Sequence, residues 1–204
     1  MNAPEPSTIM PAIGTPFEGG FFAGTFRLGE QRYCLIVAQR AEGEHDDSAW
    51  IDDYQAVPDA RSYDDGLTNT QAMAAAGSPL AQWALGLRIG EHDDWYLPSQ
   101  DELELCYRNL KPALQKNTCW VRSGINLSAL PPSRPYTPDF PVQTPAEAFR
   151  EGGAEAFAMA WYWSSTQHAA SSVCAWCQDF SSGTQDYYST TGRLRARAVR
   201  RVAI

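Results

Sequence analysis

The C-terminal stretch, residues 162–202, constrains the fold of this chain more than any other. Its first part spaces large aromatic residues (Trp163, Trp176 and Phe180) between runs of small and polar residues that show no periodicity. Its last part, RLRARAVRRV, places Arg193, Arg195 and Arg197 at alternate positions with leucine or alanine between them. Alternation with a period of two is typical of a β-strand with one polar face. The stretch therefore predicts a closing strand over residues 194–202, preceded by an irregular loop surface that aromatic side chains support.

The rest of the chain predicts a single α+β domain over residues 15–204, after a Pro-rich N-terminal arm at 1–14. Strands are expected around 21–26 and 32–38, joined by a Gly-containing turn, and the closing strand should pair with the second of them. An acidic loop is predicted at residues 42–66, and a short strand at 93–98. A long irregular insertion is predicted for the Pro-rich residues 111–149.

Helix signals lie between the acidic stretch and the insertion. A capping-box pattern begins at Thr68, Ser78-Pro79 is typical of an N-cap followed by the first helical residue, and Ser99 to Glu102 forms a second capping box. These signals predict helices packed on a small antiparallel sheet.

The charge distribution argues against nucleic acid as a partner. The chain has 24 acidic and 16 basic residues, and five of the arginines lie from position 193 onward. The first 192 residues therefore carry 11 basic against 24 acidic side chains, a formal charge of −13. Contacts to phosphate need a basic surface, so we expect the terminal arginines to pair with this acidic body instead.

The chain also lacks the signals of export and membrane insertion. Its N-terminus has no basic region or apolar run of the kind found in a signal peptide, and no stretch approaches the ~20 apolar residues of a membrane span. We expect a protein made in the cytoplasm, with no membrane partner and with its five cysteines reduced.

Two arrangements could suggest chemistry, and neither is complete. Cys174 and Cys177 form a C-x-x-C pair, but a zinc site needs four ligands and His168 is the only histidine nearby. Ser164, Ser165, His168 and Asp179 could be combined into a hydrolase triad, yet no strand–turn–helix nucleophile signature surrounds them. We therefore expect no metal, no cofactor and no enzyme activity, and we expect the serine hydroxyls to bond loop backbone.

An ordered set of motifs points to a family. These are DDWYLPSQDEL (93–103), WYWSSTQ (161–167), AW.QDF (175–180), G.Q (183–185) and RARAVRRV (195–202), with GTPFEGGFFAG near the N-terminus. The set resembles bacterial and phage domains with the C-type-lectin fold in its formylglycine-generating-enzyme-like version, and most of all the variable proteins of diversity-generating retroelements. The cysteine pair of formylglycine-generating enzymes and the calcium-binding loops of sugar-binding lectins are not matched.

The resemblance implies a signature that this sequence can be checked for. In that family, mutated Asn codons can encode most residue types but never Lys, Glu, Gln, Met or Trp. All Lys, Glu and Met residues of this chain lie outside residues 162–201. The Trp and Gln residues inside that range fall on family-framework positions: Trp163, Gln167, Trp176, Gln178 and Gln185. Residues 162–194 are therefore the candidate variable region.

The resemblance implies that residues between the framework positions bind a ligand. We expect Trp163, Trp176 and Phe180 to be buried supports and His168, Ser172, Tyr187 and Tyr188 to be exposed. Tyr187 and Tyr188 are the leading contacts, since tyrosine supplies large contact area at low entropic cost. The candidate ligand-binding residues are His168, Ala169, Ser171, Ser172, Cys174, Cys177, Ser181, Ser182, Thr184, Asp186, Tyr187, Tyr188, Ser189, Thr190 and Leu194.

The implied function is recognition of a bacterial surface receptor, either a protein or a glycan, at the tip of a phage tail fibre. The expected partners also include other virion tail proteins and further copies of the chain, for example in a trimer. Display on a bacterial cell surface is the alternative location. A structural virion or cell-surface assembly protein that uses the same fold without diversified binding is the alternative function.

Overall fold

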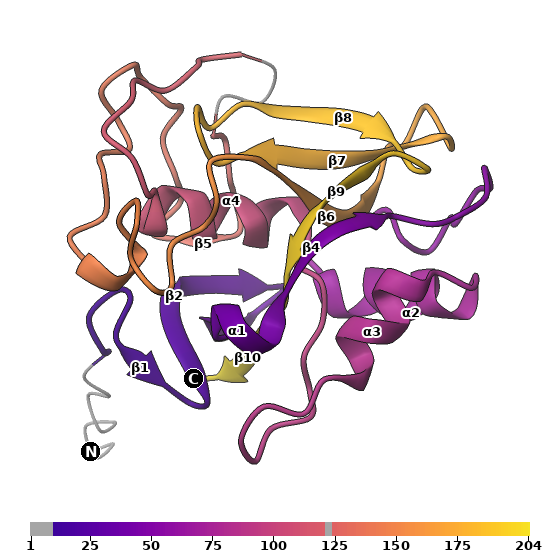
Figure 1. Cartoon of the computed structure of the whole chain (residues 1–204), viewed down its shortest axis with the longest axis horizontal. Coiled ribbons are helices and arrows are strands. Elements are labelled where there is room, and N and C mark those ends of the chain that lie inside the picture. The colour runs from indigo at the N-terminus through magenta and orange to yellow at the C-terminus, as the bar shows by residue number, and fades with distance from the viewer. Residues whose placement is uncertain (1–9, 121–123) are drawn as a thin grey trace.

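The computed structural model describes residues 10–120 and 124–204, which form two sheets with helices between and beside them (Figure 1). Residues 1–9 of the predicted N-terminal arm lie outside the described residues. Of the remainder of that arm, Met10 and Ile13 pack against the buried faces of the first strands, and Gly14 N donates to Phe22 O over 2.8 Å. The packed domain therefore includes residues before position 15.

The first sheet confirms that the two ends of the chain pair. Its strand order is β1-β2-β3-β10, and β5 pairs with the outer edge of β2. The antiparallel register of β10 against β3 runs from Val199↔Val37 to Ala203↔Tyr33. The predicted hairpin is β2 and β3 joined by a tight turn. The strands are β1 (Pro16–Phe17), β2 (Gly20–Leu28), β3 (Gln31–Val37), β5 (Ala129–Leu130) and β10 (Val199–Ala203).

The second sheet carries the candidate variable region, in the order β4-β9-β6-β7-β8. Neighbouring strands are antiparallel, except that β6 and β9 are parallel. The strands are β4 (Glu44–Ala49), β6 (Trp161–Gln167), β7 (Cys174–Asp179), β8 (Gln185–Ser189) and β9 (Arg193–Arg197). In Figure 1, β7 and β8 form a long hairpin at the top of the molecule.

Two sequence predictions were wrong in this region. The closing strand over 194–202 is two strands, because the chain passes from the second sheet to the first at Ala198, whose amide donates to Gly43 O over 2.8 Å. The acidic residues 42–49 are not a loop but continue from α1 (Arg40–Gly43) into β4. Their carboxylates lie opposite the arginines of β9, and oppositely charged cross-strand neighbours stabilise such pairing.

Two of the three longer helices confirm the predicted caps, whereas the capping box predicted at Thr68 was wrong. Ser78 Oγ accepts from Ala81 N over 3.2 Å, and Ser99 and Glu102 form a complete capping box. The first of the three begins two residues before Thr68, because Asp65 is its N-cap and accepts from Thr68 N over 3.1 Å. The helices are α2 (Gly66–Ala75), α3 (Pro79–Gly86) and α4 (Gln100–Leu110), with a short 3-10 helix at Glu147–Phe149 in the insertion. Among the described helices, none has the length and apolarity needed to span a bilayer.

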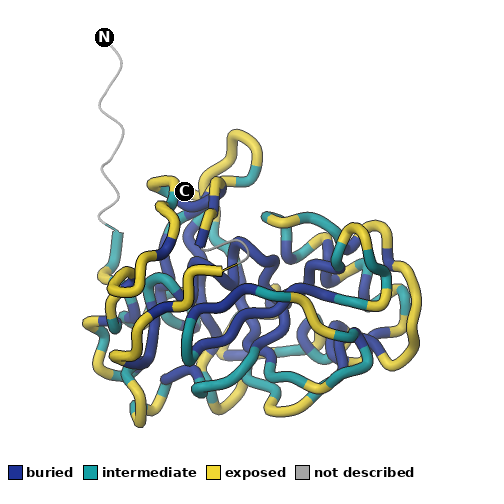
Figure 2. The backbone as a smooth tube through the Cα atoms, turned by 90° about the horizontal axis from the view of Figure 1, so that it is seen from above, coloured by how far each residue is buried: buried dark blue, intermediate teal, exposed yellow. Residues whose placement is uncertain are grey.

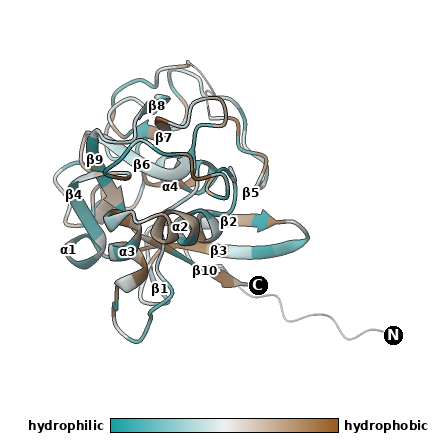
Figure 3. Cartoon of the chain, turned by 90° about the vertical axis from the view of Figure 1, so that its right-hand side faces the viewer, coloured by the Kyte–Doolittle hydropathy of each residue, from teal (hydrophilic) through white to brown (hydrophobic). Residues whose placement is uncertain are grey.

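The core lies on both sides of α4 and under the second sheet. One apolar cluster joins Phe26 and Leu35 of the first sheet to Leu103 and Tyr107 of α4 and to Phe180. A second cluster packs α2 and α3 under the second sheet, around Trp50 and Trp163. Figure 2 shows buried strands at the centre and exposed loops at the rim, and Figure 3 shows hydrophobic residues in both α2 and α3. Among these, Met73, Leu80 and Ala84 are buried. This core confirms an α+β arrangement compatible with a C-type-lectin-like fold.

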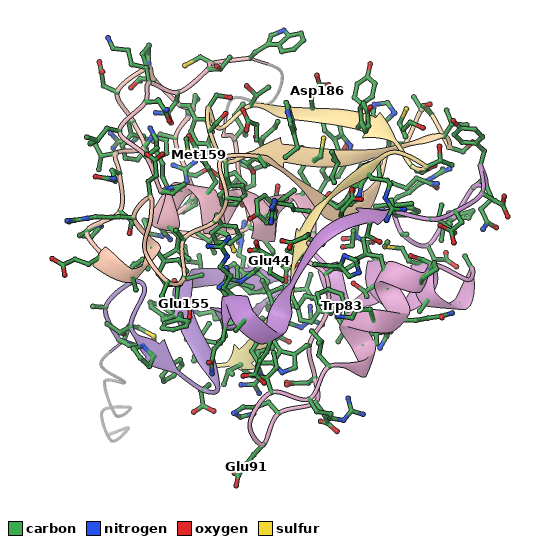
Figure 4. The ribbon with its side chains drawn as sticks, in the orientation of Figure 1. Glu44, Trp83, Glu91, Glu155, Met159 and Asp186 are labelled. Atoms are coloured by element: carbon green, nitrogen blue, oxygen red, sulfur yellow. The ribbon has the colours of Figure 1, made fainter. Side chains whose placement is uncertain are left out.

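The terminal arginines pair with the acidic body, as predicted. Arg193 contacts Asp47, Arg195 contacts Glu44 and Asp46, Arg200 contacts Asp94, and Arg201 contacts Asp65. Arg197 differs from the others, because its side chain is buried and contacts both Glu44 and Glu155. Figure 4 labels Glu44 and Glu155, the two residues whose carboxylates Arg197 contacts.

Candidate binding site

The β7–β8 hairpin presents two different faces. Its register pairs Trp176 with Tyr187, Cys177 with Asp186, and Ala175 with Tyr188. Successive side chains of a strand point to opposite faces, and directly paired residues share a face. Trp176 and Tyr187 therefore project from one face, whereas Cys177, Asp186 and Tyr188 belong to the other.

The face that carries Tyr188 lines a groove of about 340 Å³, which we call the hairpin groove. Five of its lining residues belong to the predicted ligand-binding set, and two, Trp161 and Arg193, were missed. Trp161 lies two residues before Trp163 and so shares its face of β6, a period-two signal that could have found it. The lining residues are Trp161, Cys177, Asp186, Tyr187, Tyr188, Arg193 and Leu194.

The hairpin groove combines the aromatic rings of Trp161 and Tyr188 with one charge of each sign. Tyr187 and Tyr188 are 47% and 53% exposed, which confirms that both side chains face solvent. Arg193 donates from Nε to Asp47 Oδ2 over 2.8 Å, so its guanidinium is held at the rim. Asp186 Oδ1 accepts from Tyr187 N over 2.8 Å and lies on β8 at the top of the molecule (Figure 4). Such a mixed lining suits a partly polar ligand.

The framework beneath the groove is buried, as predicted. Trp163 is fully buried, its indole N–H donates to Ser48 O over 2.8 Å, and its ring lies 6.3 Å from that of Tyr188. Phe180 is also fully buried and stacks on Phe157 with 4.1 Å between ring centroids. Trp163 is held by its hydrogen bond to β4 and by packing under β7 and β8. Its position therefore does not depend on which side chains lie at the surface above it.

The opposite face of the hairpin is an aromatic cluster. The His168 ring lies 4.5 Å from Tyr187 and 5.3 Å from Trp176, and the Trp176 and Tyr187 rings meet edge to face at 5.7 Å. Trp176 is only 6% exposed, which confirms its predicted burial. His168 and Ser172 were expected to be exposed, but both are half-buried because the Trp176 and Gln167 side chains cover them.

At one end of the hairpin, the β6–β7 turn meets the turn after β8. Ala169 is exposed there, while Ser171, Cys174 and Ser189 are half-buried. Tyr54, which sequence analysis missed, bonds Ser189 Oγ over 3.3 Å through its hydroxyl. Hydrogen bonds from Ser189 and Thr191 lower the pKa of Tyr54.

Three predicted contact residues are buried, so the prediction that they form an exposed surface was wrong. The Cys177 thiol donates to Asp186 O over 3.4 Å at the floor of the groove, and burial raises its pKa. Thr190 is fully buried because its carbonyl accepts from Trp50 N and its hydroxyl donates to Val173 O. Thr184 is buried in the β7–β8 turn.

Ser181 and Ser182 lie in that same turn, at the end of the hairpin away from His168. Both hydroxyls donate to the carboxylate of Asp179, and Ser181 N donates to it over 2.9 Å. The predicted residues therefore do not form one continuous patch. They divide between the groove, the aromatic face and the two ends of the hairpin.

The residues considered for catalysis do not assemble. Asp179 bonds the turn serines and not a histidine, Ser164 Oγ donates to Trp176 O over 2.9 Å, and Ser165 Oγ donates to Pro98 O over 3.1 Å. The serine hydroxyls thus bond backbone, as predicted. Cys174 and Cys177 are free thiols three residues apart on β7, and therefore lie on opposite faces of the strand. Over residues 10–120 and 124–204, no group of three or more His, Cys, Asp and Glu residues could hold a metal ion.

Comparison with known proteins agrees with this geometry. The family model for the Lcl C-terminal domain matches residues 46–200, which include α2 to α4, the hairpin and β9. No curated protein matches the chain. The matched span covers most of the chain and contains every residue that lines the hairpin groove. The chain therefore belongs to the Lcl C-terminal domain family, a group of C-type-lectin-like binding domains.

Proposed function

We propose that this chain is a receptor-binding protein that displays a diversified surface at the tip of a phage tail fibre. Its receptor is a protein or a glycan on a bacterial surface, and the hairpin groove is the contact. The domain is a retroelement variable protein of the formylglycine-generating-enzyme-like type, works without a metal or cofactor, and is not an enzyme. Assembly as a trimer with other tail proteins would present several grooves together and raise avidity without new contacts.

One observation carries this proposal. Six of the seven residues that line the hairpin groove come from the candidate variable region, while buried Trp163 supports the groove from below. A mutated Asn codon cannot encode tryptophan, so the support would stay constant while the lining changes. A surface that varies over a constant frame fits recognition of a changing receptor better than catalysis, which needs fixed groups.

The direct test replaces three groove residues together with residues that a mutated Asn codon can encode: Asp186→Ser, Tyr188→Ser and Leu194→Ser. Tyr188 is exposed, and Asp186 and Leu194 are half-buried. Because none of the three is fully buried, we expect adhesion to host cells to be lost while the protein stays folded, with its melting temperature lowered by several degrees. Leu114→Ser with Val142→Ser is the matched control, since these side chains are 84% and 65% exposed and lie outside the groove. Unchanged adhesion by the triple variant contradicts the groove assignment.

Sequencing the gene's surroundings tests the origin of the diversity separately. The proposal expects a reverse transcriptase gene and a near-copy of the gene's 3′ end close by. Close isolates should differ at codons 168–194 and agree at the framework codons. Identical 3′ ends in all isolates would contradict diversification while leaving the groove intact as a binding site.

A second function, an assembly protein of a virion or cell surface, is favoured by one observation on the insertion. Leu114, Trp120 and Val142 are 84%, 61% and 65% exposed, and exposed apolar side chains of this size often mark protein contacts. That function predicts that Trp120→Glu dissociates an oligomer in sedimentation experiments, whereas the groove variants leave the oligomer intact.

A further inference from the structure

A larger cavity lies on the other face of the β7–β8 hairpin, the face of Trp176. It has a volume of about 830 Å³ and lies between the β2–β3 turn, the loop before α2, the start of α4 and residues 127–128 of the insertion. We call it the arginine cavity, since Arg27 and Arg61 line it together with Glu30, Asp64, Asp101 and Trp176. Among the described residues that line it, Trp176 alone belongs to the candidate variable region.

Two buried hydrogen-bond donors that line this cavity have no acceptor among the described residues. Arg61 Nε is buried without a hydrogen bond, and among the described residues the Arg61 and Arg27 guanidinium groups make no ion pair. The indole N–H of Trp176 is also buried and unpartnered, although this side chain is only 6% exposed. A buried donor without an acceptor costs about 1–3 kcal/mol, so two such groups at one cavity call for an explanation.

The carboxylates of Asp64 and Asp101, in contrast, already accept hydrogen bonds from protein side chains. Asp64 Oδ1 accepts from Ser62 Oγ over 2.7 Å, and Asp101 Oδ2 accepts from Ser128 Oγ over 3.0 Å. Glu30 is exposed in the β2–β3 turn, where water screens its charge. The groups that still lack a partner are therefore donors, and the missing ligand must supply acceptor oxygens.

The position of Arg27 supports the same conclusion. Its cross-strand partner in the β2–β3 hairpin is Arg32, and like charges directly opposite each other destabilise a hairpin. The arginines of β9 and β10 are paired with carboxylates, whereas neither Arg27 nor Arg32 has one among the described residues. An electrostatically unfavourable pair of arginines beside a cavity is expected where a bound ligand compensates for the repulsion.

We propose that the arginine cavity binds a ligand through a single carboxylate group. A carboxylate matches the planar guanidinium in a bidentate pair, and its remaining lone pairs can accept from the Trp176 indole. The nearby carboxylates of Asp64 and Asp101 disfavour a doubly charged phosphate more than a singly charged group, because like charges repel. The cavity volume leaves room for a small organic acid about the size of a sugar acid. This site is independent of the hairpin groove, which lies on the other face of the hairpin.

The test is calorimetric titration of the purified full chain with D-glucuronate at low salt. D-glucose and inorganic phosphate serve as a neutral and a dianionic comparison. We expect glucuronate to bind, to bind more weakly as salt is added, and to bind more tightly than either comparison. No binding of glucuronate, or equal binding of glucose, overturns the proposal, and tighter binding of phosphate overturns the choice of a carboxylate.

Variants then assign the binding to these residues. Arg61→Gln and Arg27→Gln should each weaken glucuronate binding about tenfold or more, since each removes a charge-assisted contact. Arg32→Gln is the matched control, because it changes the same charge on the same hairpin but does not line the cavity. Arg27 is exposed, so its variant should fold even if Arg61→Gln does not. An equal effect of Arg32→Gln would show that only the overall charge matters and would overturn the site.

Tyr188→Ser separates this site from the groove. This variant should leave glucuronate binding unchanged while it weakens host adhesion. Loss of adhesion with glucuronate binding retained would support both sites, whereas retained adhesion with normal glucuronate binding would contradict only the groove.

Discussion

Replacing Arg197 with methionine tests what holds the two sheets together. Arg197 lies at the end of β9, where the chain crosses from one sheet to the other, and its side chain is fully buried. Its guanidinium donates to Ala38 O over 2.9 Å, to Glu44 Oε2 over 3.1 Å and to Glu155 Oε2 over 2.8 Å, and it lies 5.2 Å from the centre of the Phe157 ring. This side chain therefore joins β3, β4, β9 and the 153–157 loop.

The expected loss of unfolding free energy follows from the buried carboxylates that Arg197→Met leaves without this partner. Removing one partner of a buried ion pair costs about 3–5 kcal/mol, because the other charge stays buried without compensation. Glu44 keeps Arg195 at 3.0 Å, and Glu155 keeps the Arg40 amide at 2.7 Å, so the cost should fall near the low end, about 3 kcal/mol. For a chain of this size, that corresponds to a melting temperature lowered by about 6–12 °C.

The assay is urea denaturation followed by tryptophan fluorescence, which reports on both sheets. Arg193→Met is the matched control, since its ion pair with Asp47 is 60% and 63% exposed and should contribute less than about 1 kcal/mol. Adding Glu155→Gln to Arg197→Met should recover part of the lost stability, because Arg197 is the cation that Glu155 contacts among the described residues and its unpaired charge then disappears. A loss below about 1 kcal/mol for Arg197→Met alone would refute the reasoning that this contact holds the sheets together.

Three further predictions concern stability and reactivity. Burial alone would raise the pKa of Asp65, but hydrogen bonds from Thr68 and the Arg201 guanidinium lower it overall. Asp65 therefore stabilises the fold above its unfolded pKa, and this contribution is lost as the pH falls through its folded pKa. Asp65→Asn should therefore reduce the acid dependence of the unfolding free energy below about pH 5, and an unchanged pH profile would contradict this account. Ser99→Ala removes the α4 capping box and should cost about 1–2 kcal/mol in urea denaturation. Thr118→Ala, at an exposed position outside the helices, is the comparison and should change the stability by less than about 0.5 kcal/mol. In a thiol-reagent assay of the folded protein, exposed Cys119 should react first, whereas buried Cys177 should react only on unfolding, because burial raises the pKa of its thiol.

Local patterns in the sequence were enough to predict several elements. The tight turn between two apolar runs predicted the β2–β3 hairpin, and the serine signals at 78 and 99 predicted the starts of α3 and α4. These features depend on contacts within a few residues, which a sequence displays directly. The same holds for Trp163, whose size and apolarity made a buried position the expected one.

The tertiary structure alone decided which faces are covered. Alternation in the closing stretch showed that Arg193 and Arg197 share a face. Only the pairing of β9 with β4 and the approach of Glu155 bury Arg197 while Arg193 stays at the surface. In the same way, the exposed-looking Thr190 is buried because residues 50 and 51 bond its carbonyl from far away in the chain. Arg27, Arg61 and Trp176 meet at one cavity only because three distant segments fold together. A period of two assigns residues to faces, whereas long-range packing determines which face meets water.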